Sequence, residues 1–355
     1  MAALRQRCGA LALALARCNH AGLPRGLAGA PEIFDGRAKR AQRARKAYGR
    51  RLKEDKNARD GMPPPLPEML GHQVTSKLLD TLFDVQREFP TVLNVGGACE
   101  EALALLRQSK KSMEKIIVAD TSHDMIKKLT RSSGRDGDIE VHGLVAEEDM
   151  LPLATASCDL VVSSLGLHWV NDLPLAMQEC SRVLKEDGLF LAALFAEDTL
   201  SELRVSCTLA HEERLGGVAS RVSPFVRAGE LGTLMSAAGL RLTTIDVDPI
   251  KIRYPSAAHL VEHLRSMAES NALQARTSLS RDVAMATSAI YDAMFSSSED
   301  DGGGVYATYQ VVYLIGWKAS KNQPKEAARG SATVSLKELD RLLSDRDTSS
   351  KGPDA

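Results

Sequence analysis

The 355-residue chain lacks an apolar run that approaches the roughly 20 residues needed to cross a lipid bilayer. It also lacks an excess of either charge, because 45 Lys and Arg stand against 46 Asp and Glu. That balance gives no reason to expect a nucleic-acid partner. The six cysteines form no CxxC pair, which argues against a disulfide framework or a zinc site and predicts buried free thiols. The length suits one large domain or two small ones.

Acidic residues and lysine are absent from the first 31 positions, which carry four arginines among many Ala and Leu. An arginine-bearing, acid-free, amphipathic start is typical of a mitochondrial transit peptide, which we predict for residues 1–31. Two alternatives stay open: a secretory signal built on GALALALA, and a start that carries no signal. The first alternative has a short apolar core that Arg17 follows at once.

A basic run, FDGRAKRAQRARKAYGRRLKEDKN, occupies residues 34–57. It is read either as a solvated helix or unfolded arm, or as a segment that adheres to an anionic membrane face. Residues 60–67, DGMPPPLP, cannot form a regular element because consecutive prolines lack amide donors. We therefore predict a basic arm and Pro-rich hinge over 32–70, a folded domain over 71–320 and a polar tail over 321–355.

Between residues 74 and 195, strand patterns alternate with helical patterns. This alternation, with strands that are almost continuously apolar, predicts a parallel sheet covered by helices on both faces. Two later strand patterns can pair with each other in antiparallel fashion. The predicted strands cover residues 91–95, 115–120, 139–146, 159–165, 188–195, 240–248 and 305–319. Mainly helical segments at 197–227 and 251–271 are expected to roof the pocket.

Ligands of open α/β sheets bind at the carboxyl ends of the strands. Gly96 and Gly97 follow the first strand, and Asp120 ends the second. The number of residues between these glycines and Asp120 suits an acid that accepts hydrogen bonds from both hydroxyls of a ribose. Glu147 and Glu148 follow the third strand and could accept a hydrogen bond from the exocyclic amine of adenine. The simpler interpretations are a helix cap for Asp120 and a solvated loop for the acids. Together they favour an adenosyl ligand.

The stretch LPLATASCDLVVSSLGLHWVNDLPLAMQECSRVLKEDGLFLAALFAEDTLSELR resembles the class I methyltransferases that use S-adenosylmethionine. Further motifs narrow the resemblance: SSLGLHWVNDLP, FAEDTLSELR, VSPF, MAESN, ATYQVVYLIGW and RGSATVS, in this order, resemble the mitochondrial complex I assembly factor 5 family over about residues 31–336. The malonyl-carrier methyltransferases of the biotin pathway share the central motif and are the alternative branch.

This resemblance implies a Rossmann-like, seven-stranded class I methyltransferase sheet with a helical lid insert. It implies a protein of the mitochondrial matrix, peripheral to the inner membrane, that assists early assembly of NADH:ubiquinone oxidoreductase. It also implies hydroxylation of an arginine in an iron–sulfur subunit of that complex. The subunit and its assembly intermediates would be the partners. S-adenosylmethionine or a related adenosyl ligand would be held by Gly96, Gly97, Asp120, Glu147, Glu148 and Leu165.

The glycine motif departs from the family pattern of acid-x-Gly-x-Gly-x-Gly. Asn94 stands in place of the acid, Ala98 in place of the second glycine and Glu100 in place of the third. Ala and Glu tolerate positive φ poorly, and Glu100 would repel the carboxylate of the cofactor. We therefore expect an intact adenosine half and a damaged methionine half. A methyltransferase and a non-catalytic assembly factor remain alternatives to the hydroxylase.

His168 and Trp169 follow the fourth strand and are the candidates for a catalytic role, with packing as the simpler interpretation. Asn171 and Asp172 are expected to cap the next helix. Glu269 and two other acids could face a substrate arginine, and three arginines could bind a carboxylate or an acidic peptide; all could also be surface ion-pair partners. These further residues are Asp198 and Glu202, and Arg204, Arg214 and Arg253.

A hydroxylase often uses an iron site of two histidines and one carboxylate. His211 with Glu212 and Glu213 gives one such grouping, and His259 and His263 lie one helical turn apart. Both groupings fall in predicted helices without the neighbouring strands that such a site needs. We therefore interpret them as surface or amphipathic residues and predict no metal site.

Overall fold

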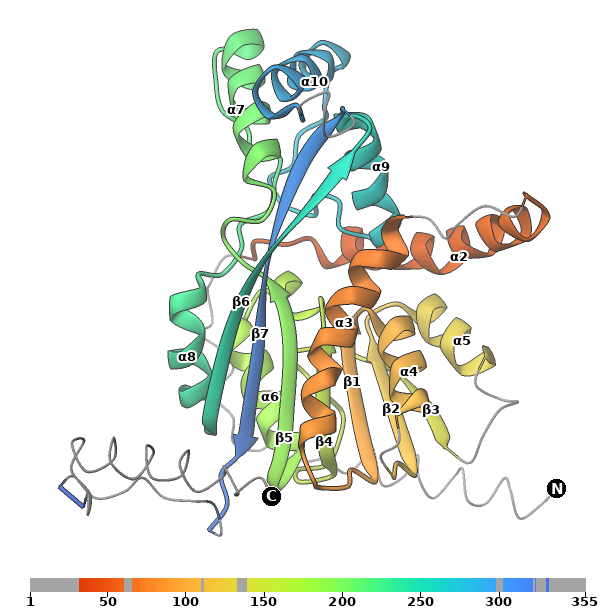
Figure 1. Cartoon of the computed structure of the whole chain (residues 1–355), viewed down its shortest axis with the longest axis vertical. Helices are drawn as coiled ribbons and strands as arrows, with labels where there is room; N and C mark the ends of the chain where they lie inside the picture. Colours follow the sequence, from red (N-terminus) through yellow and green to blue (C-terminus); the bar gives the residue numbers. More distant parts are fainter. Residues whose placement is uncertain are drawn as a thin grey trace, which may run out of the picture. The chain divides into compact units, whose positions relative to one another are not determined.

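An open seven-stranded sheet forms the centre of the computed structural model (Figure 1). The structure describes residues 32–60, 66–109, 112–132, 139–297, 303–321, 323 and 330–331. The chain divides into two units, residues 1–319 and residues 320–355, and the sheet belongs to the first. The predicted transit peptide and most of the predicted tail lie outside the described residues, so the predicted domain boundaries stay predictions.

The strand order is β3-β2-β1-β4-β5-β7-β6, in which only β7 runs antiparallel to its neighbours. This arrangement confirms the predicted seven-stranded class I methyltransferase sheet and the antiparallel pairing of its last two strands. The strands are β1 (Thr91–Gly97), β2 (Lys115–Asp120), β3 (Glu140–Val145), β4 (Cys158–Ser164), β5 (Leu184–Phe195), β6 (Leu240–Tyr254) and β7 (Val305–Lys318).

Helices cover both faces of the sheet and bury its apolar side chains. On one face lie α3 (Leu66–Asp84), α4 (Cys99–Gln108) and α5 (His123–Ser132), and on the other lie α6 (Leu173–Val183) and α8 (Ala228–Ala237). Because side chains alternate along a strand, Val92 of β1 joins the first layer while Leu93 and Val95 join the second. This two-sided burial explains why the central strands are almost continuously apolar.

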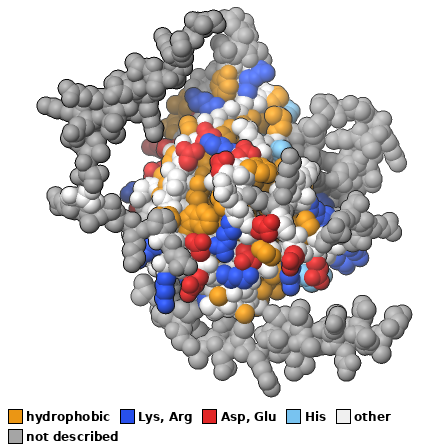
Figure 2. Space-filling view, turned by 60° about the horizontal axis from the view of Figure 1, so that its bottom comes forward, with side chains coloured by type: hydrophobic (Ala, Val, Ile, Leu, Met, Phe, Trp, Pro, Cys, Tyr) orange, Lys and Arg blue, Asp and Glu red, His pale blue; other side chains and the backbone are white. Residues whose placement is uncertain are grey.

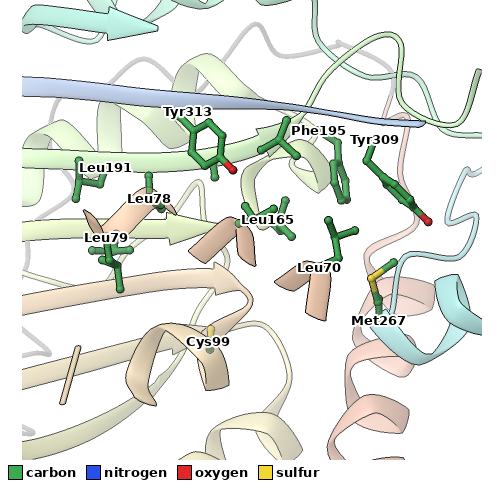
Figure 3. Close-up of a cluster of buried hydrophobic side chains, with 14 of the residues drawn as sticks. Leu70, Leu78, Leu79, Cys99, Leu165, Leu191, Phe195, Met267, Tyr309 and Tyr313 are labelled. Atoms are coloured by element: carbon green, nitrogen blue, oxygen red, sulfur yellow. The ribbon is translucent and has the colours of Figure 1, made fainter. Parts of the chain in front are cut away.

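The apolar layer under α3 extends to the carboxyl edge of the sheet. Leu165, which directly follows β4, packs in the same buried cluster as Leu70 of α3 and Phe195 of β5. Figure 3 shows these three side chains close together, with Tyr309 and Met267 nearby. These buried side chains therefore form an apolar layer next to the carboxyl edge of the sheet.

Strand β6 is longer than the sequence indicates. The predicted strand ends at residue 248, directly before Pro249, yet β6 continues to Tyr254 and pairs with β7 down to Val305. β6 is the edge strand of the sheet, where a missing amide donor costs no ladder hydrogen bond. The β6–β7 ribbon consequently projects beyond the end of β5 (Figure 1).

Three helices gather around the projecting ribbon: α7 (Ser201–Leu215), α9 (Ala257–Met267) and α10 (Arg281–Phe295). α7 and α9 fall in the segments from which the sequence predicts a lid over the pocket, whereas α10 lies outside both segments. Tyr254, at the end of β6, is buried beneath α9, where its hydroxyl group bonds His263 Nδ1 and lies 3.0 Å from the Tyr309 hydroxyl. The ribbon thus positions the lid above the carboxyl ends of the parallel strands.

The basic run folds as helix α2 (Gly36–Asp60) and crosses the carboxyl ends of the strands (Figure 1). Along its first part, Lys39, Gln42, Arg43 and Ala47 are buried at helical spacing. The segment is therefore neither an unfolded arm nor a helix solvated on all sides, because this part of it is packed on the domain. The stretch 60–67 is expected from the sequence to form no regular element, yet Asp60 ends α2 and Leu66 and Pro67 begin α3, where a proline is tolerated in the first turn. Residues 61–65 lie outside the described residues.

Four of the six cysteines fall within the described part, and all four are free and buried, as predicted. No helix among the described residues is long and apolar enough to span a membrane. On the face shown in Figure 2, basic and acidic side chains are interspersed. This mixture agrees with the near-zero net charge of the sequence.

Candidate functional site

The turn after β1 is built on two glycines with left-handed backbone. Gly96 has φ +58° and Gly97 has φ +66°, values that other residues adopt only at a cost. A side chain on Gly97 would overlap the carbonyl oxygen of Ser164, and one on Gly96 would come within 2.8 Å of Glu148 Oε1. The loop can therefore approach β4 closely, and Ala98 N donates to Ser164 O over 2.6 Å.

The expected damage to this loop is not what the structure shows. Ala98 has φ −83°, which suits alanine, so the position does not require glycine. Glu100 lies in the first turn of α4, and its carboxylate pairs with Lys128 of α5 over 2.5 Å. The charge expected to repel a cofactor carboxylate is thus neutralised by a lysine. Asn94 is buried, lines neither hollow described below, and has no hydrogen-bond partner among the described residues.

A second turn, after β4, faces the glycine turn. Leu165 takes φ +54°, a conformation that costs a branched side chain about 1–3 kcal/mol and that is concentrated at functional sites. Its amide donates to Ala193 O over 2.7 Å, which ties the turn to β5. A side chain on Gly166 would come within 2.8 Å of Gly97 N. The two turns are therefore pressed together.

Two neighbouring hollows open at these turns. The first, beside the acids that follow β3, brings together all the predicted cofactor residues except Gly96 and Asp120; its lining is Phe34, Gly36, Lys39, Arg43, Gly97, Thr121, Glu147, Glu148, Asp149, Leu165, Gly166, Trp169, Val170 and Asn171. The second, toward α9, is lined by Arg43, Lys46, Gly71, Gly97, Ala98, Glu101, Leu165, Met267 and Glu269. Arg43, Gly97 and Leu165 line both hollows.

Asp120, the predicted ribose acid, is buried and already engaged. Its Oδ1 accepts from Ser122 N over 2.7 Å, and its Oδ2 pairs with the guanidinium group of Arg43 from α2. Arg43 also donates to Gly97 O over 2.7 Å. Burial acts to lower the pKa of Arg43, but the adjacent Asp120 outweighs it and the pKa is raised. A cation of the chain itself thus occupies the place expected for ribose hydroxyls.

The acids after β3 differ in their surroundings. Burial raises the pKa of Glu148 to about 7, and Arg43 beside it opposes that shift. Burial also raises the pKa of Glu147, which forms an exposed pair with Arg40 of α2 at 3.5 Å. Glu148 therefore exchanges a proton near neutral pH and can act as a donor or an acceptor toward a ligand.

A second cation of α2 is buried between the two hollows. Lys39 Nζ lies 3.7 Å from the centroid of a Trp169 ring, 3.3 Å from Glu269 Oε1 and 2.6 Å from Ala268 O. Burial lowers the pKa of Lys39 to about 7 against the attraction of Glu269. Burial alone would raise the pKa of Glu269, but Lys39 and His168 lower it to about 2. Glu269 is therefore a carboxylate at neutral pH.

The two catalytic candidates both contact Glu269. His168 Nε2 lies 3.0 Å from Glu269 Oε2, and Trp169 Nε1 donates to the same oxygen over 2.7 Å. Burial lowers the pKa of His168, and its ring packs against Phe195 and Phe225. His168 lines neither hollow, whereas Trp169 lines the first. His168 therefore contacts Glu269 from outside both hollows, and Trp169 contacts it from the wall of the first hollow.

The remaining acidic and basic candidates line neither hollow. Asp198 and Glu202 bind Gln310 and Thr308 of β7. Each of the three arginines has a partner of its own: Arg204 reaches Glu197 O, Arg214 pairs with Glu213, and Arg253 reaches Gly303 O. Of the two helix-cap predictions, Asp172 caps α6 and accepts from Leu175 N, whereas Asn171 instead accepts from Ile33 N and Phe34 N.

Each of the histidines considered as iron ligands has another hydrogen-bond partner. His211 accepts from Arg221 Nε, His259 bonds Ser256, and His263 bonds Tyr254. Across the described segments, no three His, Cys, Asp or Glu side chains are grouped so that they could hold a metal ion.

The site fits an adenosyl ligand in part. The cradle at Gly96 and Gly97 leaves no room for side chains, and Glu148 and Leu165 line the hollow beside it. Asp120 can receive ribose hydroxyls only after Arg43 moves, because its side chain is 0% exposed and is paired with the Arg43 guanidinium group. The fit therefore depends on the position of α2.

Lys39 and Arg43 are the site residues that the sequence analysis missed. Their basic neighbours make the run look solvated, and charged side chains produce no apolar stripe. The one available signal was their spacing, because residues 39, 42, 43, 46 and 47 fall on one face of a helix.

Comparisons with known proteins agree with the fold. A family model for a methyltransferase domain matches residues 93–192. The YcgJ protein from Bacillus subtilis has a similar structure, with a TM-score of 0.50 and 17% identity over 70% of this chain and 99% of that chain. At this identity the likeness concerns the fold.

The relatives in sequence narrow the family further than the similarity in fold does. The mitochondrial arginine-hydroxylase NDUFAF5 of Rattus norvegicus is 39% identical over 313 residues, which cover 87% of this chain and 88% of the relative. The malonyl-[acyl-carrier protein] O-methyltransferase of Methylovorus sp. is 29% identical over 70% of this chain and 82% of that protein. The first relative matches at higher identity and over more of both chains.

Proposed function

The chain belongs to the NDUFAF5 arginine-hydroxylase family, and from this membership we propose that it hydroxylates an arginine of a mitochondrial protein during the assembly of complex I. The observation that carries the proposal is the cluster around Glu269. A buried carboxylate and an indole ring hold a cationic side chain beside the glycine turn. A protein that acts on arginine needs such a place for a positive side chain.

The proposed reaction replaces one C–H bond of an arginine side chain by C–OH. This two-electron oxidation would take its oxygen atom from dioxygen, with a two-electron reductant and two protons that convert the second oxygen atom to water. Near the site, the buried Leu70, Leu165 and Phe195 provide apolar surface that contributes to a dry environment. Glu269 is held as an acceptor by His168 and Trp169. In the proposed complex these groups bind and orient the arginine and keep water from its stem.

We assign the adenosyl ligand to the first hollow. Gly96 and Gly97 would receive its polar end, Asp120 its ribose and Glu148 its base. S-adenosylmethionine supplies an electrophilic methyl group when bound, and a related ligand would use the same contacts. In this proposal Arg43 must give up Asp120 before the ribose enters.

The proposed client is an iron–sulfur subunit of complex I, met within assembly intermediates on the matrix side of the inner membrane. The chain's resemblance to the complex I assembly factors supports the client, and the word "mitochondrial" in the relatives' names supports the compartment. Arg37, Arg40 and Arg45 on the exposed side of α2 favour peripheral contact with an anionic membrane.

Mass spectrometry of complex I tests this function. Cells that lack the protein are complemented with the wild-type chain or with an empty vector, and the arginines of the iron–sulfur subunits are compared. We expect one arginine to gain the mass of one oxygen atom only when the chain is present. If complex I assembles in the presence of the chain while every such arginine stays unmodified, the protein is a non-catalytic assembly factor.

A methyltransferase is the second candidate. It is favoured by the intact geometry of the glycine turn and by the similarity to the malonyl-carrier enzyme. The same mass spectra distinguish the two activities, since a methyl group and an oxygen atom differ in mass. The non-catalytic alternative loses one of its supports, because the loop is not damaged in the way the sequence suggested.

A further inference from the structure

We propose that Trp169, Glu269 and the Ala268 carbonyl form the subsite for the guanidinium group of the client arginine, and that Lys39 occupies this subsite as a substitute for the substrate. The inference rests on the proposed function and deepens it, because it assigns the residues that recognise the substrate. We call these three groups the cation cage. It lies between the two hollows, since Trp169 lines the first and Glu269 the second.

The cage has the components that recognise a cation. An aromatic face lies 3.7 Å below the Lys39 ammonium group, and a carboxylate and a carbonyl oxygen accept from it at 3.3 and 2.6 Å. The Glu269 side chain is only 9% exposed. A buried carboxylate without a cation is costly, so the cage favours a positively charged occupant. In the absence of a client, the chain provides it from α2.

Lys39 is suited to be replaced. Its four-carbon stem is flexible, and an ammonium group fills only part of what the cage offers. A guanidinium group can stack on the indole and place two N–H groups on one carboxylate, which a lysine cannot do. An arginine is therefore the better ligand. Lys39 can leave by rotating its side chain, without unfolding α2.

The docking of α2 supports this exchange. From residue 34 to residue 48, Phe34 and Ala47 are the buried apolar side chains, and the remaining buried ones are Lys39, Gln42 and Arg43. When the helix moves, its polar contacts can be replaced by other polar contacts. This costs less free energy than separating an apolar face from the domain, because little apolar surface becomes exposed to water. The helix can therefore shift when a client arrives.

Fluorescence of Trp169 gives a direct test. The chain has two tryptophans, and Trp317 lies on β7 outside both hollows. In the full chain with Trp317→Phe, Trp169 is the single reporter. The probe is N-acetyl-L-arginine methylamide, and its neutral isostere is N-acetyl-L-citrulline methylamide. We expect the arginine probe to change the Trp169 emission in a saturable way and the citrulline probe to bind at least about tenfold more weakly.

Substitutions in the cage test separately whether Glu269 recognises the arginine probe and whether Lys39 competes with it for the cage. Glu269→Gln should weaken binding of the arginine probe by about tenfold or more, whereas Asp198→Asn, an exposed acid elsewhere, should leave it unchanged. Lys39→Met should strengthen binding about tenfold because the internal competitor is gone, and Lys39→Arg should weaken it because the competitor improves. Arg45→Met removes a charge from the exposed side of α2 and should have no effect.

Circular dichroism identifies any variant that fails to fold. If Lys39→Met does not fold, Lys39→Arg still tests whether the residue at position 39 competes with the probe. Equal binding of the two probes, or unchanged binding after Glu269→Gln, would overturn the cage. Probe binding without any hydroxylated client arginine would instead overturn the proposed function and leave the cage standing. Hydroxylation that persists in cells carrying Glu269→Gln would overturn the cage alone.

Discussion

Single residues decide the shape of the cradle at the carboxyl edge. Gly96 and Gly97 take left-handed backbone where the turn needs it, and Leu165 takes it across from them. Two of the three positions at which the motif departs from its family, Ala98 and Glu100, adopt ordinary backbone or lie in a helix. The motif read letter by letter therefore overstated the damage to the turn, because neither Ala98 nor Glu100 takes the positive φ that favours glycine.

Gly97→Ala should abolish this cradle. The added methyl group would overlap the Ser164 carbonyl oxygen at a left-handed position, so we expect a loss of about 2–4 kcal/mol in the free energy of unfolding. Urea denaturation followed by circular dichroism measures it. Gly229→Ala, in α8 with open space around it, is the matched control and should be neutral or slightly stabilising. Equal effects of the two substitutions would contradict the steric argument.

Glu148 should give the protein a pH-dependent stability. Its pKa is raised by burial to about 7, so the folded state holds a proton that the unfolded state releases above about 4.5. The stabilisation is complete below pH 4.5 and is lost as pH rises through 7. Since solvent still reaches this side chain in part, we expect about 1–2 kcal/mol.

Unfolding of the wild type and of Glu148→Gln in urea at a series of pH values between 4 and 8 tests this. The free energy of unfolding of the wild type should fall relative to that of the variant across this range. Parallel curves for the two proteins would show that Glu148 titrates normally.

At the scale of elements, α2 is the feature that distinguishes this site. It places Arg43 on Asp120 and Lys39 on Glu269, so one helix fills both the ribose position and the cation cage. The loop after α9 holds the start of this arm, with Asp35 N donating to Ala272 O over 2.7 Å. The lid and the arm are therefore connected, and a movement of one is expected to affect the other.

Arg43→Met should open the ribose position. We expect S-adenosylhomocysteine to bind about tenfold more tightly than to the wild type, because the ion pair with Asp120 no longer has to be broken. The same change should cost about 3–5 kcal/mol of stability, since Asp120 stays buried without a cation. Isothermal titration calorimetry and denaturation measure the two effects.

Arg45→Met, on the exposed side of the same helix, is the control for the loss of charge and should alter neither quantity. Weaker ligand binding by Arg43→Met would mean that Arg43 contacts the ligand itself, which would reverse the role that we assign to it.

For the whole first unit, stability is expected to be uneven. The strands β1, β4 and β5 are buried on both faces, whereas α2 is attached mainly through charged and polar side chains. Elements with few buried apolar contacts open more often than the core. The helix that covers the site is thus attached by less apolar burial than the central strands are, which suits a cover that must move.

Hydrogen exchange measured by mass spectrometry should show this difference. Amides of residues 36–47 in α2 should exchange at least about tenfold faster, after correction for intrinsic rates, than those of residues 158–164 in β4. Saturation with N-acetyl-L-arginine methylamide should speed exchange in α2 and leave β4 unchanged. Equal protection of the two segments would place α2 in the cooperative core and argue against exchange of Lys39.

The sequence alone determined much of the sheet and part of the site. The alternation of strand and helix patterns predicts the parallel strands, because two-sided burial requires apolar runs that are visible in the sequence. The turn at Gly96 and Gly97, Asp120 and the acids after β3 follow from strand order, since parallel strands place their carboxyl ends together. Glu269 was a candidate through its charge, without a known position.

Only the tertiary structure decided what these residues contact. Arg43 meets Gly97 across 54 positions of sequence, and Lys39 meets Glu269 across 230. Contacts between charged side chains this far apart leave no periodic pattern, so the basic run looked solvated. The pairing of Glu100 with Lys128 and the passage of β6 through Pro249 depend likewise on neighbours in space. The sequence encodes burial through local periodicity, whereas charge pairing is settled by the packing of distant elements.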